Sequence, residues 1–230
     1  MSDALDRDAP GLSALAEPVR RALYRFVARS PEPVSREQAA EGTEVAAHTA
    51  KFHLDKLVDE GLLEVEFRRL TGRSGPGAGR PAKLYRRAAR QFAVSVPERD
   101  YALIGQILAE AVEEAAATGE PVRQVAAAVA RRHGELVGQE SAGEGGGPAL
   151  ARLAEVLETT GYEPRLDEDG RLLLENCPFD RMAEQHTELV CGLNLDFVEG
   201  VIDGLGCTGV RACLDPAPGR CCVSAGSRNE

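Results

Sequence analysis

All six cysteines of this 230-residue chain lie in its last quarter, at Cys177, Cys191, Cys207, Cys213, Cys221 and Cys222. Thirteen residues separate Cys177 from Cys191, fifteen separate Cys191 from Cys207, and Cys221 and Cys222 are adjacent. This wide spacing lacks the close Cys-x2-Cys pairs of zinc ribbons and the Cys-x2-Cys-x2-Cys run of ferredoxins. If these thiols bind a metal, a folded domain must bring them together.

The compartment decides how such thiols are interpreted. The N-terminus, MSDALDRDAP, is acidic and has no apolar stretch typical of a secretory signal, and no apolar run reaches the 18 residues of a membrane span. We therefore expect a cytoplasmic protein with no membrane partner. Thiols stay reduced in the cytoplasm, so the cysteines indicate metal or redox chemistry before structural disulfides.

The charge of the chain is unevenly distributed. The net charge of −10 argues against a nucleic-acid partner, but residues 1–92 carry +3 and residues 93–230 carry −13. Residues 68–90 contain no acid and eight basic side chains: Arg68, Arg69, Arg73, Arg80, Lys83, Arg86, Arg87 and Arg90. Such a run is commonly a solvated surface, but here it follows a helix-turn-helix pattern and therefore favours DNA binding.

That pattern consists of two short helices joined by a turn. Ser35 is a suitable N-cap for a helix over SREQAA, with Glu37 nearby, and Gly42 ends it. A second helix is predicted from Val45 to Glu60, with Gly61 ending it. Its outward face carries Ala47, His48, Lys51, Phe52 and Asp55. This helix could be an ordinary surface helix, but its place in the motif predicts a recognition helix for the major groove.

Two strands with a Gly- and Pro-rich connection follow. LLEVEFRRL and KLYRR flank TGRSGPGAGRPA, which is typical of a hairpin wing. Gly79-Arg80-Pro81 resembles the hooks that place an arginine in a narrow minor groove. We therefore expect DNA contacts from the recognition helix and from the basic residues of the wing: Ala47, His48, Lys51, Phe52, Arg68, Arg69, Arg73, Arg80 and Lys83.

Residues 10–90 resemble the ArsR-type winged-helix transcriptional regulators through ALAEPVRRALYRFV, HTAKFHLDKLVDEGLLEVE and GRPAKLYR. The resemblance implies a winged-helix DNA-binding domain over residues 1–92. The metal-sensing thiols common near the recognition helix in that group are absent here. Sensing, where present, must use another part of the chain.

The remaining sequence predicts three further segments. Residues 93–140 contain two helical patterns, which could be a helical linker but which we interpret as a homodimerisation segment, because helix-turn-helix proteins usually read paired half-sites. Residues 141–148, SAGEGGGP, are typical of a flexible hinge. Residues 149–230 predict a small α+β domain with two hairpins and a long helix from about 179 to 206. The fold class expected for the whole chain is α+β.

The C-terminal motifs NCPF, HTELVCG and the closing Cys-Cys are similar to those of the SufR-type iron–sulfur cluster-sensing repressors. The resemblance implies Cys177, Cys191 and one of Cys221 or Cys222 as ligands of an iron–sulfur cluster, most simply [4Fe–4S]. His186, five residues before Cys191, is a candidate fourth ligand, although a lone helical histidine is more often structural. The resemblance gives Cys207 and Cys213 no role.

Three functions are therefore compared. The first is a homodimeric transcriptional repressor that binds an operator in double-stranded DNA and senses its cluster, with Fe–S assembly genes implied as targets by the resemblance alone. The second is a zinc-binding or thiol–disulfide redox regulator that uses the same cysteines. The third, an enzyme, is not expected, because no nucleophile–base arrangement, P-loop or dinucleotide fingerprint is present.

Overall fold

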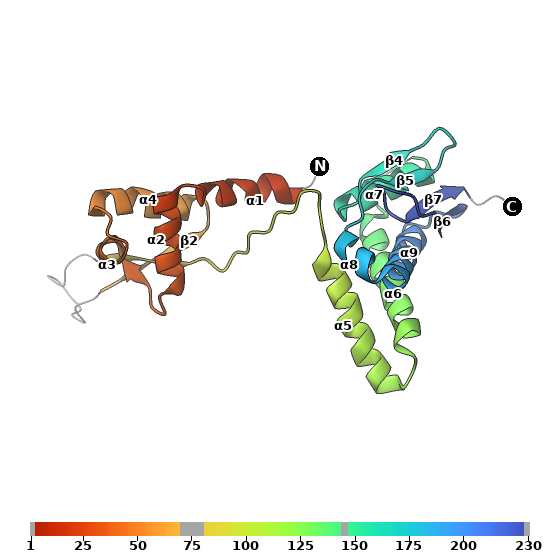
Figure 1. The fold of residues 1–230 in the computed structure, drawn as a ribbon, viewed down its shortest axis with the longest axis horizontal. Helices are drawn as coiled ribbons and strands as arrows, with labels where there is room; N and C mark the ends of the chain where they lie inside the picture. The colour runs from red at the N-terminus through yellow and green to blue at the C-terminus, as the bar shows by residue number, and fades with distance from the viewer. Residues whose placement is uncertain (1–2, 70–80, 144–146, 228–230) are drawn as a thin grey trace. The chain divides into compact units, whose positions relative to one another are not determined.

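A computed structural model describes residues 3–69, 81–143 and 147–227. The chain divides into two compact units, Asp3–Val94 and Ser95–Glu230. Figure 1 shows the elements of each unit along the chain. Arg73 and Arg80, the predicted contacts at the tip of the wing, lie outside the described residues. Among the described residues, no helix is long and apolar enough to cross a membrane.

The first unit combines four helices with a three-stranded antiparallel sheet in the order β1-β3-β2. Its elements follow one another as α1 (Asp3–Ala14), α2 (Pro18–Arg29), β1 (Val34–Ser35), α3 (Arg36–Gly42), α4 (Ala47–Asp59), β2 (Leu63–Arg68) and β3 (Ala82–Arg87). Leu23, Leu54, Leu57 and Tyr85 are among the side chains of its buried core. Helices α3 and α4 form a helix-turn-helix, and the antiparallel strands β2 and β3 that follow them form the wing, so this unit is a winged helix-turn-helix.

Local signals in the sequence position the helix-turn-helix. The Ser35 hydroxyl accepts a hydrogen bond from the Gln38 amide at 3.2 Å, and the Gln38 side chain accepts one from the Ser35 amide at 2.8 Å. This capping box confirms Ser35 as the N-cap, but its partner is Gln38 rather than Glu37. Gly61 follows α4 with φ +73°, a conformation that glycine adopts without steric cost. The chain can therefore turn directly from α4 into the wing.

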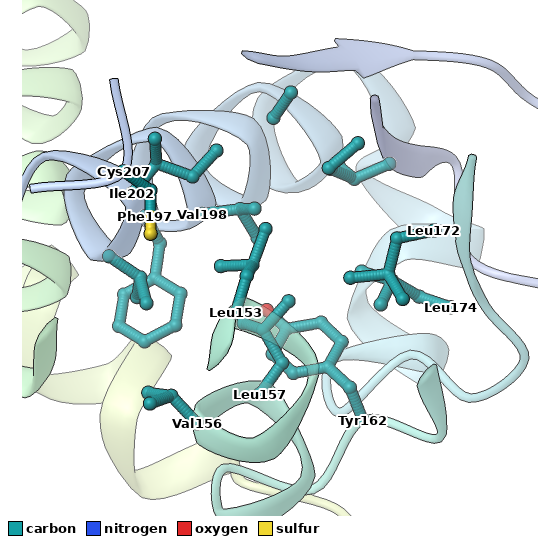
Figure 2. Close-up of a cluster of buried hydrophobic side chains, with 14 of the residues drawn as sticks. Leu153, Val156, Leu157, Tyr162, Leu172, Leu174, Phe197, Val198, Ile202 and Cys207 are labelled. Atoms are coloured by element: carbon teal, nitrogen blue, oxygen red, sulfur yellow. The ribbon is translucent and has the colours of Figure 1, made fainter. Parts of the chain in front are cut away.

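The second unit packs five helices with a four-stranded antiparallel sheet in the order β4-β5-β7-β6. Its elements are α5 (Tyr101–Thr118), α6 (Val122–Ser141), α7 (Ala149–Thr159), β4 (Pro164–Leu166), β5 (Leu172–Leu174), α8 (Asp180–Gln185), α9 (Thr187–Gly204), β6 (Val210–Leu214) and β7 (Val223–Ser227). Figure 2 shows Leu153, Tyr162 and Phe197 in its main hydrophobic core. The predicted α+β fold class is confirmed, and the two predicted hairpins join into one sheet through β5 and β7.

The predicted single helix from 179 to 206 is wrong, because the chain breaks at His186. His186 has φ −134° and ψ 48°, between the end of α8 and the start of α9. The Thr187 hydroxyl donates a hydrogen bond to the carbonyl of Ala183 at 2.7 Å, so at this point a side chain bonds to a backbone carbonyl of α8. Residues 179–206 therefore form two helices, and Cys191 belongs to the second.

Helices α6 and α9 approach each other backbone to backbone. Gly134 and Gly138 lie on α6, and Gly200 and Gly204 lie on α9. A Cβ atom added to any of the four would meet the backbone of the facing helix at less than 3.0 Å. The segment predicted for dimerisation, residues 93–140, thus contributes α6 to the core of the second unit. Its role in dimerisation stays a prediction.

Candidate sensor site and DNA-binding face

The cysteines selected from the sequence lie in one neighbourhood of the second unit. Cys177 follows β5, Cys191 lies in the first turns of α9, and Cys221 and Cys222 directly precede β7. Cys191 and Cys222 are joined as a disulfide, and the Cys177 and Cys221 side chains are hydrogen-bonded to each other. We call these four residues the four-cysteine site. Adjacency of Cys221 and Cys222 in the chain links the two pairs.

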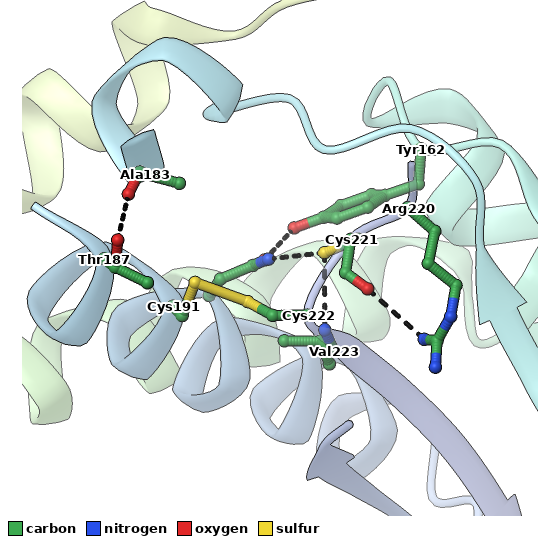
Figure 3. The surroundings of a disulfide bond; sticks show 9 residues. Tyr162, Ala183, Thr187, Cys191, Arg220, Cys221, Cys222 and Val223 are labelled. Carbon is green, nitrogen blue, oxygen red and sulfur yellow. Dashed lines mark hydrogen bonds between the residues drawn. A yellow bond between two sulfur atoms is a disulfide. The ribbon is translucent and has the colours of Figure 1, made fainter. Parts of the chain in front are cut away.

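The disulfide connects α9 to the segment before β7. The Cα atoms of Cys191 and Cys222 are 6.4 Å apart, within the usual range for a disulfide. Figure 3 shows this bond beside Cys221 and Val223. The sequence favours metal or redox chemistry over structural disulfides, whereas in the structure two of the candidate ligands are bonded to each other.

The Cys221 sulfur accepts several hydrogen bonds. The Asn194 side-chain amide donates to it at 3.1 Å, and the Val223 backbone amide lies at 3.5 Å. The hydrogen bond with Cys177 is the main cause that lowers the pKa of Cys221, and it raises the pKa of Cys177, which burial raises further. A sulfur that is surrounded by donors is stabilised as a thiolate, the form that binds metals and attacks disulfides.

Asn194 owes its position to a buried tyrosine. The Tyr162 hydroxyl donates a hydrogen bond to the Asn194 side-chain oxygen. Both residues are almost fully buried, and burial raises the pKa of Tyr162 well above its ordinary value. The tyrosine therefore remains a hydrogen-bond donor and holds the amide oxygen, which leaves the amide N–H group directed at Cys221.

Hydrogen bonds to its backbone and to the neighbouring Asn176 hold Cys177 in place. Arg99 donates to the Cys177 carbonyl at 3.1 Å and also to the Asn176 side chain and Asp180. Asn176 is buried and donates to the carbonyls of Glu98 and Gly161 at 2.8 and 2.7 Å. These contacts fix the loop between β5 and α8 that carries Cys177. The supporting residues Arg99, Tyr162, Asn176 and Asn194 were missed by the sequence analysis.

The structure also places the adjacent cysteines and His186, the candidate fourth ligand. Cys221 and Cys222 precede β7, and each sulfur contacts another cysteine. His186 is exposed and lies at the break between α8 and α9, so it is not within a helix as the sequence predicts. No hydrogen bond joins the His186 side chain to a cysteine within the described residues.

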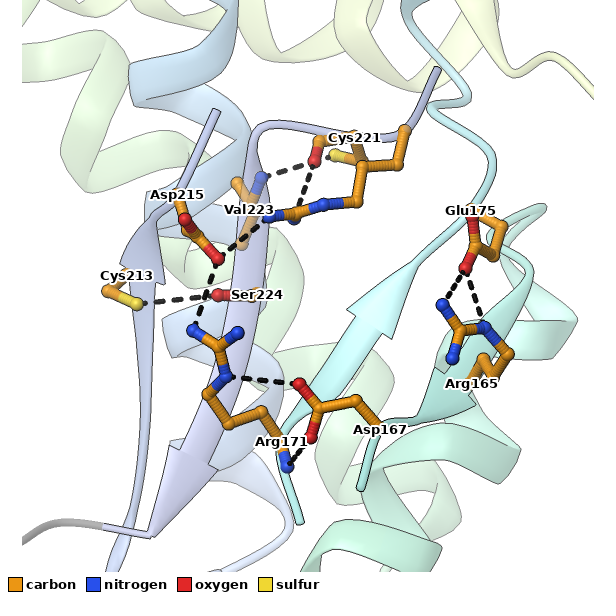
Figure 4. Close-up of polar contacts among 10 residues, drawn as sticks. Arg165, Asp167, Arg171, Glu175, Cys213, Asp215, Cys221, Val223 and Ser224 are labelled. Carbon is orange, nitrogen blue, oxygen red and sulfur yellow. Dashed lines mark hydrogen bonds and ion pairs between the residues drawn. The ribbon is translucent and has the colours of Figure 1, made fainter. Parts of the chain in front are cut away.

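The remaining cysteines lie apart from this site. Cys207 is buried in the main core, and its sulfur is 3.7 Å from the Ala149 carbonyl. Cys213 is exposed on β6, and its sulfur is 3.4 Å from the Ser224 hydroxyl. Figure 4 shows Cys213 and Ser224 near the ion pair of Asp215 with Arg171, and Asp215 also pairs with Arg220 at 2.8 Å. Neither sulfur therefore belongs to the four-cysteine site.

The donor set of the four-cysteine site suits a soft metal centre once the disulfide is reduced. Four thiolates are the usual ligands of iron–sulfur clusters and of structural zinc. With Cys191 and Cys222 bonded to each other, no group of three or more His, Cys, Asp or Glu side chains is arranged to hold a metal ion in the part of the chain that the structure describes. Metal and disulfide therefore exclude one another, because they use the same sulfurs.

The first unit carries the predicted DNA-contacting face. Ala47, His48, Lys51 and Phe52 are all exposed on the first turns of α4, while Leu54 and Leu57 face the core. Phe52 is 66 % exposed, and its ring lies edge-on to the His53 ring with 5.3 Å between the two ring centres. The structure thus brings together on one helix surface the four residues predicted for the major groove.

The described part of the wing is basic but partly neutralised. Arg68 pairs with Glu66 at 2.7 Å and with Glu32 at 3.4 Å, and Arg69 is exposed after β2. Lys83 on β3 lies 2.5 Å from the Asp55 carboxylate of α4. Burial opposes the charged form of Lys83, but the hydrogen bond to Asp55 raises its pKa. The lysine is therefore fully charged and already paired.

Comparison with known proteins agrees with this geometry. A family model described as a helix-turn-helix domain matches residues 15–66, which run from the end of α1 into β2. A search of curated proteins finds no match to the chain. The family match and the winged fold together support a DNA-binding transcriptional regulator of the winged helix-turn-helix type, as in ArsR- and MarR-like proteins, rather than an enzyme.

Proposed function

We propose that this protein is a homodimeric transcriptional repressor whose affinity for its DNA operator is controlled by an iron–sulfur cluster in the second unit. The observation that carries the proposal is the convergence of Cys177, Cys191, Cys221 and Cys222 from three separate segments. No other pair among the six cysteines is joined by a disulfide or by a thiol–thiol hydrogen bond in the described residues. Convergence of this kind is what a soft-metal site requires.

Cys177, Cys191 and one or both of Cys221 and Cys222 would hold the cluster. When bound, a [4Fe–4S] cluster supplies a centre whose integrity depends on iron supply and oxidants. The protein contributes the thiolates, the Asn194 amide N–H that donates to Cys221, and the Arg99 contact that fixes the Cys177 main chain. Hydrogen bonds to the ligating sulfurs are one means by which proteins tune such centres.

A thiol–disulfide switch is the second candidate, and the Cys191–Cys222 disulfide favours it. In that case oxidation joins α9 to the segment before β7, and reduction frees both thiols. A zinc site built from the same thiols is the third candidate. All three versions place sensing at the four-cysteine site and differ only in what occupies it.

The output of the proposed switch is DNA binding by the first unit. Lys51 and His48 would reach base edges or phosphates from α4, and Phe52 would contact thymine methyl groups in the major groove. Coupling of sensing to DNA binding requires a difference of only about 1–3 kcal/mol between the two states. Fe–S assembly genes are proposed as targets on resemblance alone.

Dimerisation is proposed through α5 and α6. Val112 on α5 and Leu136 on α6 expose 56 % and 53 % of their surface, while the opposite faces of both helices are buried in the unit. Light scattering on the full chain at micromolar concentration should give the mass of a dimer. A monomer would remove the symmetric reading of two half-sites.

Purification under nitrogen followed by iron, sulfide and zinc analysis tests the cofactor directly. The proposal predicts a brown protein with iron and sulfide in near-equal amounts and absorbance near 400 nm. Stoichiometric zinc without iron would move the assignment to the zinc site. Metal-free protein with a quantitative Cys191–Cys222 disulfide after anaerobic isolation would move it to the thiol–disulfide switch.

A further inference from the structure

The recognition helix carries a carboxylate in the middle of the predicted DNA-contacting face. Asp55 lies on α4, one turn after Lys51, and an acidic side chain is repelled by DNA phosphates. We propose that Asp55 limits sequence-independent DNA binding by this protein, because it pairs with Lys51 and Lys83 and withholds their charges from the phosphates. The inference rests on the proposed DNA-binding function.

Three partners surround the Asp55 carboxylate. One oxygen lies 2.5 Å from Lys83 Nζ and accepts a hydrogen bond from the Tyr85 hydroxyl at 3.0 Å. The other oxygen lies 4.0 Å from Lys51 Nζ. Lys83 Nζ also stands over the Tyr85 ring, 5.0 Å from its centre. One carboxylate therefore pairs with a lysine on the recognition helix and with a lysine on β3 of the wing.

The surroundings keep this carboxylate charged. Burial opposes ionisation, but the hydrogen bonds from Lys83 and Tyr85 hold the pKa of Asp55 below its ordinary value. Tyr85 is 2 % exposed, so its hydroxyl is a fixed donor that holds the carboxylate in place. Asp55 is thus a permanent negative charge whose position is set by a buried side chain.

This pairing has a consequence for binding to DNA. Each lysine that neutralises a phosphate adds about 0.9 to the steepness with which log affinity falls against log salt. A lysine that must first leave a carboxylate contributes less, because breaking the ion pair opposes the gain. The wild-type protein should therefore bind random-sequence DNA more weakly, and with a shallower salt dependence, than its basic residues alone would give.

Asp55→Asn in the full chain tests this, with a random-sequence duplex as the probe. Asparagine is nearly isosteric and its oxygen can still accept from Tyr85, while the negative charge is removed. The slope of log affinity against log salt should steepen by about one to two in the variant. The ratio of the variant's affinity to that of wild type should grow about threefold per released lysine when salt falls from 200 to 50 mM.

Asp59→Asn is the matched control. Asp59 lies one turn further along α4, is exposed, and has no basic partner within the described residues. Asp59→Asn changes the net charge by the same amount as Asp55→Asn and lies on the same helix, but it releases no lysine. The salt dependence should therefore stay at the wild-type value. An equal effect of both substitutions would overturn the inference, because net charge alone would then explain the gain.

A double substitution separates release of Lys83 from other effects. Lys83→Gln should change the salt dependence little in the wild-type background and should remove about half of the gain in the Asp55→Asn background. If Asp55→Asn does not fold, Lys83→Gln can be compared with Arg69→Gln, since Arg69 has no acidic partner among the described residues. The inference predicts a clearly smaller loss for Lys83→Gln.

Two results would contradict the inference. An unchanged salt dependence in Asp55→Asn, or equal losses for Lys83→Gln and Arg69→Gln, would show that the lysine charges are not withheld. Failure of every protein to bind duplex DNA at any salt concentration is a different outcome, which would overturn the proposed function and this inference with it.

Discussion

The side-chain amide of Asn194 lies 3.1 Å from the sulfur of Cys221 and donates a hydrogen bond to it. Asn194 also stands one helical turn after Cys191, whose sulfur is bonded to Cys222. One helix, α9, therefore contacts both members of the adjacent cysteine pair. A change at either sulfur acts on the same helix, which also packs backbone to backbone on α6.

Asn194→Ala should destabilise the protein by about 1–3 kcal/mol, because it leaves the buried Tyr162 hydroxyl and the Cys221 sulfur without their partner. Chemical denaturation followed by circular dichroism measures the change. Glu188→Ala is the control on the same helix: its ion pair with Arg123 is exposed on both sides and should contribute less than about 1 kcal/mol. Similar losses in both variants would show that the buried amide contributes no more than an exposed side chain of the same helix.

The α6–α9 contact predicts opposite effects for two glycines of one helix. Gly200→Ala should cost about 1–3 kcal/mol, since the added methyl group would press on the Arg131 backbone of α6. Gly192→Ala adds the same methyl group where nothing lies within 4 Å, and should stabilise α9 by up to about 1 kcal/mol. Equal changes in the midpoint of unfolding would contradict the close approach of the two helices.

Asp8 gives the first unit an acid-sensitive contact. Its side chain is 3 % exposed and accepts a hydrogen bond from Arg90 at 2.8 Å, which is the main cause that lowers its pKa from 3.8 to about 2. A carboxyl whose pKa is lower in the folded state stabilises that state above its unfolded pKa, and this contribution is lost as the pH falls.

Wild type should therefore be more stable than Asp8→Asn above about pH 4, and the difference should shrink between about pH 4 and pH 2. Thermal unfolding of both full-length proteins across this range measures it. A difference that stays constant with pH would mean that the Asp8 charge does not contribute.

Much of the fold follows from local sequence signals. Ser35 and Gly61 mark helix ends in ways that depend only on neighbouring residues, and the structure confirms both. The helical and strand segments of the second unit were also predictable from periodicity and turn residues. The break at His186 was not, because neither proline nor glycine marks it.

The candidate site was predictable only in part. The resemblance selects Cys177, Cys191 and one of Cys221 or Cys222, but the pairing of these cysteines depends on how α9 packs against the end of the sheet. Asn194 reaches Cys221 across 27 residues of sequence, and no local pattern encodes that distance. The available signal was a polar amide within the apolar run LVCGLNLDFV. The glycines spaced four residues apart in HGELVG and in EGVIDG were likewise an available signal of a close helix contact.

The central claim is that the state of the four-cysteine site sets DNA affinity. The most direct test measures iron, sulfide and affinity for a selected operator on the same anaerobic preparations of wild type, Cys191→Ser and Cys213→Ser, before and after oxidative removal of iron. We expect wild type and Cys213→Ser to hold iron and to change affinity when it is lost. Cys191→Ser should hold no iron and bind like iron-free wild type throughout. Iron loss in wild type with unchanged operator affinity, or iron retention in Cys191→Ser, would contradict the account.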